Sequence, residues 1–233
     1  AWIPSAFSQK AIYMDVATDA NVVVTDPSGR KTGVDSRFSK PYSQWTWLKE
    51  IPNSAIGFES EENLPSFTHY EGVLNSPQGN GSFTIEIVGN KTRLIWLQVS
   101  ANPRHHVTDV SEANFEILNI PIEKDSVVSY RFTYHSPIGS PVSLIKVVSA
   151  RSLLQDVAAM KKVGWITKRT VVDKYFKLIR SYDIQVHQGT LIGAQIALTN
   201  ILQNISSDSS KGLPAEACKS IRVDVESLMK QNQ

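Results

Sequence analysis

Cysteine is almost absent from this sequence of 233 residues, and its scarcity limits the possible folds. The single Cys218 cannot form a disulfide within the chain, so stability must come from packing. Cys218 lies among aliphatic residues at helical spacing, where we expect an inert thiol. Long hydrophobic runs are absent too. None approaches the roughly 18 residues of a transmembrane helix, which predicts no membrane insertion.

Signatures of the common enzyme classes are also missing from the sequence. It contains no Gly-x-Ser-x-Gly, no His-Glu-x-x-His and no phosphate-binding loop. Basic residues of the C-terminal part are scattered among aliphatic stripes, which argues against nucleic-acid binding. We therefore predict a non-catalytic protein without a cofactor.

The composition is that of a globular protein, with 41% hydrophobic and 20% charged residues. Charge is unevenly distributed: residues 1–150 carry 12 Lys and Arg against 15 Asp and Glu, whereas residues 151–233 carry 12 against 7. A basic C-terminal part indicates either contact with an anionic partner such as a cell-wall polymer or ordinary solvated helix surfaces.

Residues 1–149 show the period of two that is typical of half-buried strands. Ile12, Met14 and Val16 share one face, and the β-branched residues 22–24 lead into the turn 26–29. In this turn proline presets φ and glycine accepts a positive φ. About seven to nine short strands with frequent turns predict an antiparallel, immunoglobulin-like β-sandwich domain.

From residue 150 the hydrophobic period changes to about 3.6 residues. Val172, Tyr175 and Ile179 belong to one core stripe, Gly164 is expected to end the first helix, and residues 206–212 are expected to form a polar loop. Residues 150–233 are therefore predicted to form a second domain, a small antiparallel four-helix bundle.

The N-terminal segment is apolar, with Trp2, Ile3 and Phe7 around a proline. An exposed segment of this kind is an aggregation hazard, so we expect it to dock. It packs either on its own domain or, as an added strand, on a neighbouring copy. In the second case these three residues are the self-assembly site.

Two tryptophans and four aspartates are candidates for ligand binding. On a strand, Trp45 and Trp47 share a face, so they either stack on sugar rings or cover the end of a sandwich. Carboxylates near the first hairpin are weak Ca²⁺ candidates; because their spacing is irregular, we expect no metal site. These carboxylates are Asp15, Asp19, Asp26 and Asp35.

Three Asn-x-Ser/Thr triplets are candidate glycosylation sites if the host glycosylates proteins: Asn80, Asn90 and Asn204. The first two fall in predicted hairpin turns, where a glycan is accessible. The first residue is Ala1 rather than Met, which is consistent with removal of a signal peptide or with a piece cut from a longer chain.

Two segments resemble known modules. Residues 22–33 read V-V-V-T-D-P-S-G-R-K-T-G and resemble the V-T-D-P-x-G-R-x-T-G hairpin of a β-rich module in secreted bacterial and archaeal proteins. The helical part, with S-L-L-Q-D-V, G-W-I-T-K and A-C-K-S-I-R-V-D-V-E-S-L, resembles the FIMAH domain, a four-helix module at the C-termini of many secreted proteins. Both resemblances imply a secreted, extracellular protein, and neither motif is catalytic.

The sequence thus predicts a secreted structural or adhesive protein. Its specific form is self-assembly into an extracellular filament or surface layer through the N-terminal segment. The alternative is a carbohydrate- or cell-wall-binding accessory module of a larger exoprotein, with Trp45 and Trp47 as the binding residues.

Overall fold

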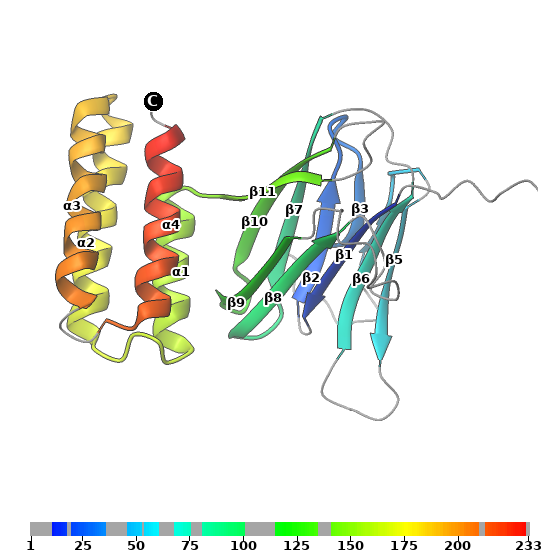
Figure 1. Ribbon diagram of the computed structural model, residues 1–233, viewed down its shortest axis with the longest axis horizontal. Helices are drawn as coiled ribbons and strands as arrows, with labels where there is room; N and C mark the ends of the chain where they lie inside the picture. The colour runs from blue at the N-terminus through cyan, green and yellow to red at the C-terminus, as the bar shows by residue number, and fades with distance from the viewer. Residues whose placement is uncertain are drawn as a thin grey trace, which may run out of the picture. The chain divides into compact units, whose positions relative to one another are not determined.

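The computed structural model describes residues 11–17, 20–35, 46–52, 54–60, 68–75, 81–100, 115–134, 141–209 and 213–231. These residues form strands in two antiparallel sheets, followed by helices (Figure 1). The predicted order, strands first and helices afterwards, is confirmed.

The five-stranded sheet has the order β5-β6-β1-β8-β9, and the six-stranded sheet has the order β11-β10-β7-β2-β3-β4. The bounds of the first sheet are β5 Ser54–Ser60, β6 Thr68–Asn75, β1 Ala11–Ala17, β8 Arg93–Ser100 and β9 Phe115–Ile122. Those of the second are β11 Pro141–Val147, β10 Val127–Tyr134, β7 Gly81–Gly89, β2 Ala20–Thr25, β3 Lys31–Asp35 and β4 Thr46–Lys49.

The predicted hairpin joins β2 to β3, with Val23 opposite Gly33. Its turn closes through a bond from the Gly29 N–H to the Asp26 carbonyl (2.9 Å), and Gly29 has a φ of +82°. The Asp26 carboxylate accepts bonds from the backbone N–H groups of Ser28 and Arg30 and from Arg30 Nε (2.7 Å). The turn is therefore held by side-chain as well as backbone contacts.

The sheet core follows the predicted alternation. Ile12, Met14 and Val16 of β1 are fully buried, as expected. Phe83 of β7 and Phe132 of β10 stack with ring centroids 5.1 Å apart, and both are buried. Aromatic pairs of this kind add to the free energy gained from area burial alone.

The chain divides into two compact units. The first comprises Ala1–Asn90, Ile95–Ile120 and Ser129–Ile145; the second comprises Lys91–Leu94, Pro121–Val128 and Lys146–Gln233. The second unit therefore contains two short segments from the strand region as well as all four helices. An ion pair between Lys162 and Glu123 (2.7 Å) joins one of these segments to a helix.

The helices are α1 Ala150–Lys162, α2 Arg169–His187, α3 Leu191–Ser209 and α4 Ala215–Gln231. Ser149 and Ser152 form a reciprocal capping box at the start of α1. Gly164, with a φ of +84°, follows the end of α1 as predicted. The expected polar loop at residues 206–212 is wrong in part: α3 continues to Ser209, because buried Asp208 finds partners inside the unit.

The helices share one apolar core. α2 packs against α1 and α3, and α4 packs against α1 and α3. The predicted stripe residues Val172, Tyr175 and Ile179 are all buried in it. Within the described part of the chain, no helix combines the length and the apolar character needed to cross a bilayer.

Candidate functional site

Several predicted site residues lie outside the described residues. They are Trp2, Ile3, Phe7, Trp45, Asp19 and Asn80. Trp47 belongs to β4, where its backbone pairs with Val34. The tryptophan pair and the N-terminal segment therefore stay predictions.

Three of the four carboxylates near the first hairpin belong to described residues, and they lie in different elements. Asp15 is half-buried in β1 and Asp35 belongs to β3, whereas both oxygens of Asp26 accept hydrogen bonds within the turn. Across the residues that the structure describes, no three His, Cys, Asp or Glu side chains are grouped so as to hold a metal ion.

The remaining glycosylation candidates occupy different environments. Asn90 follows β7 and its Oδ1 accepts a bond from the buried Asn21 (3.3 Å). Asn204 lies within α3, and its Nδ2, the atom to which a glycan would attach, donates to the Asn200 carbonyl (2.7 Å). Of the two, Asn90 has its side-chain nitrogen outside a helix.

The most unusual surface in the helical unit lies on α3. Of its nineteen residues only Asp208 is charged, and that side chain is buried. The core side of α3 is formed by aliphatic residues that include Ala194, Leu198 and Ile201. The opposite side, which we call the outer face of α3, is exposed and comprises Ile192, Gln195, Ile196, Thr199 and Gln203.

The outer face of α3 exposes large aliphatic side chains. Ile192 is 76% exposed and Ile196 is 57% exposed, one helical turn apart. Leu191 of α3 and Ile184 of α2 are also largely exposed. Exposed isoleucines on a helix face without charged side chains are typical of a contact surface. The arrangement can therefore bind an apolar surface.

The α2–α3 connection holds this surface in place. The Thr190 hydroxyl donates to the Gln185 carbonyl (2.9 Å) and lies 2.8 Å from Gln185 Oε1. Gly193 lies against the Gln185 side chain, where a Cβ would collide with it. The start of α3 is thus packed closely on α2, which presents Ile192 from a rigid element.

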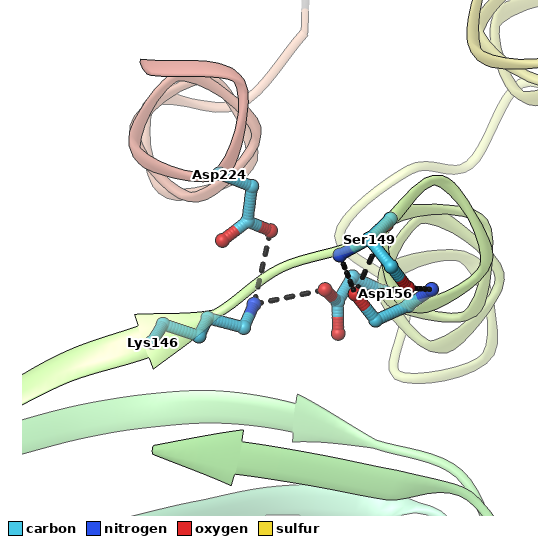
Figure 2. Close-up of polar contacts among 5 residues, drawn as sticks. Lys146, Ser149, Asp156 and Asp224 are labelled. Carbon is cyan, nitrogen blue, oxygen red and sulfur yellow. Dashed lines mark hydrogen bonds and ion pairs between the residues drawn. The ribbon is translucent and has the colours of Figure 1, made fainter. Parts of the chain in front are cut away.

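A second site is a buried cluster of three charged side chains. Lys146 Nζ lies 2.8 Å from Asp156 Oδ2 of α1 and 2.9 Å from Asp224 Oδ2 of α4, and it points between the two helices (Figure 2). The side chains of Lys146, Asp156 and Asp224 are 11%, 3% and 1% exposed. One ammonium therefore faces two carboxyl groups in a nearly dry environment.

The cluster carries one more acidic group than basic groups. Burial raises the pKa of Asp224 to about 7; the neighbouring Asp156 raises it further, and the Lys146 ammonium opposes both effects. Below that pH the Asp224 side chain is mainly a neutral carboxylic acid. A proton on Asp224 thus removes the negative charge that Lys146 alone would not balance.

A third cluster surrounds Asp208. Lys174 Nζ donates to both Asp208 oxygens (2.9 and 2.7 Å), and the Tyr175 hydroxyl donates to Oδ2 (3.2 Å). Burial, together with Asp208, raises the pKa of Tyr175 well above its usual range, and burial raises that of Cys218. A shallow hollow of about 220 Å³ adjoins the cluster; it is lined by Ile166, Thr167, Lys168, Thr170, Val171, Asp208, Leu213 and Pro214.

Sequence reasoning missed both buried clusters, although a signal for them exists. Asp156 stands three residues after Leu153 and four before Met160, on the core stripe of α1. Asp224 has the equivalent place on α4. An acidic residue at a core position needs a partner, and that partner is a basic residue from elsewhere in the chain.

The chain was compared with family models, with curated proteins and with solved structures. None of the three comparisons finds a match. The resemblances noted for the hairpin and for the helical part therefore stay predictions.

Proposed function

We propose that this chain is an extracellular structural or adhesive protein that acts by associating with further copies of itself. The observation that carries the proposal is the uncharged outer face of α3, where Ile192 and Ile196 are largely exposed. Binding would remove this apolar area from water, which is the main favourable term in protein association.

A second copy is the occupant that suits this face best. The outer face of α3 has no charge, so two copies meet across a two-fold axis without like-charge repulsion. By contrast, α2 carries charges of both signs along its length, among them Arg169, Asp173 and Lys177. We therefore expect α3 to pack against α3 of the partner.

Growth from a pair into a filament needs a second contact, for which we propose the N-terminal segment. Trp2, Ile3 and Phe7 would add a strand to the sheet of a neighbouring copy. An added strand pairs with an edge strand of a sheet. Within the described residues, the edge strands are β5 and β9 in one sheet and β4 and β11 in the other. The extracellular location rests on the sequence resemblances.

The same proposal includes a finer description of the fold. We infer that the two antiparallel sheets form an immunoglobulin-like sandwich and that the four helices form an antiparallel bundle. Support comes from fully buried residues in both sheets and from the shared core of the helices.

The experiment is to replace Ile192 and Ile196 together by Glu and to measure molar mass by sedimentation equilibrium over a range of concentrations. Wild type should show mass that rises with concentration, and the double variant should not, because two carboxylates at each contact repel and resist desolvation.

Val223→Glu is the matched control, since Val223 is 49% exposed on α4 and does not belong to the outer face of α3. It should associate as wild type does. A wild type that stays monomeric, or a control that loses association equally, would refute the role of α3. Deleting residues 1–9 tests the second contact: pairs should persist and longer assemblies should disappear.

A further inference from the structure

We propose that Lys146 and Asp224 become joined by an amide (isopeptide) bond inside the helical unit, with Asp156 as the proton-transfer group. The inference does not depend on self-association. It rests on the three side chains described above, all within the second unit: Lys146 from the end of β11, Asp156 from α1 and Asp224 from α4.

The reacting groups are already in hydrogen-bond contact. Lys146 Nζ is within hydrogen-bond distance of one oxygen of each carboxyl group, and the close-up shows it between Asp156 and Asp224 (Figure 2). Holding an amine against a carboxyl group in a fixed geometry replaces a bimolecular encounter by an intramolecular one, which raises the rate greatly. Exclusion of water also favours condensation over hydrolysis.

Amide formation needs a neutral amine and a neutral carboxylic acid, because an ammonium lacks a lone pair. Lys146 Nζ gives one proton to the Asp156 carboxylate, which lies 2.8 Å away. With Asp224 protonated, the transfer leaves one amine and two carboxylic acids. No charge then remains buried in the cluster, so the low-polarity surroundings favour this arrangement.

The lone pair of Nζ then attacks Cγ of Asp224, and the carbonyl π electrons move to oxygen. Asp156 donates its proton to the departing hydroxyl group and accepts one from the new C–N nitrogen. The carbonyl re-forms as water leaves. The balance is one ammonium, one carboxylate and one carboxylic acid giving one amide, one carboxylic acid and one water; no oxidant or reductant is required.

Asp224 rather than Asp156 is the acceptor for two reasons. Its side chain is the least exposed of the three, at 1%. Burial also favours its neutral, electrophilic form, since it raises the pKa of Asp224. The product links Lys146, which precedes α1, to α4 and encloses α1, α2 and α3 in a covalent ring. Such a ring restricts the unfolded chain, as a disulfide does elsewhere.

Intact mass spectrometry of the full chain in denaturant tests the bond. Folded wild type should be lighter than its sequence by one water molecule, and proteolysis should release a branched peptide that joins Lys146 to Asp224. Lys146→Arg keeps a cation opposite both carboxyl groups but provides no amine that deprotonates, so it should retain the full sequence mass.

Asp156→Asn removes the proton acceptor while keeping the shape of the side chain. After refolding from inclusion bodies, its rate of water loss should fall on the order of 100-fold, with the circular dichroism spectrum unchanged. Asp224→Ala should show no mass loss. If that variant does not fold, Lys146→Arg still decides the question.

A folded wild type with the full sequence mass after prolonged incubation would overturn the proposal. So would a branch at Asp156, or a loss of water that persists in Lys146→Arg. Because Lys146→Arg leaves the outer face of α3 intact, it should associate as wild type does, which separates a failure of the bond from a failure of self-association.

Discussion

At the scale of single residues, the behaviour of the helical unit depends on acids placed where a hydrophobic residue is expected. Asp156, Asp208 and Asp224 are all buried, and each has a basic partner at hydrogen-bond distance. Buried ion pairs contribute little to net stability, but loss of one partner is costly because the other charge is left unpaired. Such residues therefore hold neighbouring segments in a specific arrangement.

Lys146→Met tests this at the residue scale, since it removes the cation that lies within hydrogen-bond distance of both Asp156 and Asp224. Relative to Lys146→Arg, which keeps a cation there and forms no amide, we expect the free energy of unfolding at neutral pH to fall by about 3–5 kcal/mol. Urea unfolding followed by circular dichroism measures the change. Adding Asp224→Asn should restore part of the loss, because the amide is neutral.

The pH dependence of the Lys146→Met variant has a definite sign. Burial raises the pKa of Asp224 to about 7 with the cation present, and removing the cation raises it further. A carboxyl whose pKa is higher in the folded than in the unfolded chain binds its proton more tightly when folded. Stability should therefore be highest in acid and should fall as pH rises from about 4 past 7. A variant that becomes more stable over this range would contradict the assignment.

At the scale of elements, the strands and helices follow the sequence closely, and the differences have local causes. Ile12, Met14 and Val16 indicated β1, and the turn at residues 26–29 indicated the β2–β3 hairpin. The predicted end of α3 is wrong because its serine-rich segment has the composition of a loop. Asp208 is held in the last turn of α3 by hydrogen bonds from Lys174 and Tyr175. Because these residues are distant in the sequence, the local composition does not reveal the contact. The Lys146 cluster was missed for the same reason.

Gly33 gives a prediction at the element scale. It has a φ of +136°, and a Cβ there would collide with the backbone of Val22 and Val23 in β2. We expect Gly33→Ala to lower the free energy of unfolding by about 3–4 kcal/mol, since strain and steric overlap add. Chemical denaturation measures it.

Gly29→Ala in the adjoining turn is the matched comparison. Gly29 also has a positive φ, but a Cβ there meets no atom within 4 Å. Its replacement should therefore cost only the backbone strain, about 1–2 kcal/mol. Equal losses for the two variants would show that the close approach of β2 to Gly33 is not a determinant of stability.

At the scale of the whole molecule, the proposed function depends on two surfaces, the outer face of α3 and the N-terminal segment. The sequence alone indicated association through the N-terminal segment. It did not single out the outer face of α3, because the hydrophobic period of α3 indicates its core side and gives no sign of what covers the uncharged opposite side. Ile192 and Ile196 are recognisable in the sequence only once the core side of α3 is known.

Disulfide trapping tests α3-to-α3 association most directly. In a Cys218→Ser background the chain has no other cysteine, and Gln195→Cys places one thiol in the middle of the outer face. A disulfide requires Cα atoms within about 7 Å, so only a close contact is trapped. Glu226→Cys in the same background, on the exposed side of α4, is the control. Mild oxidation should convert the Gln195→Cys chain to covalent dimers and leave the Glu226→Cys chain monomeric; equal yields, or no dimer with Gln195→Cys, would contradict association through α3.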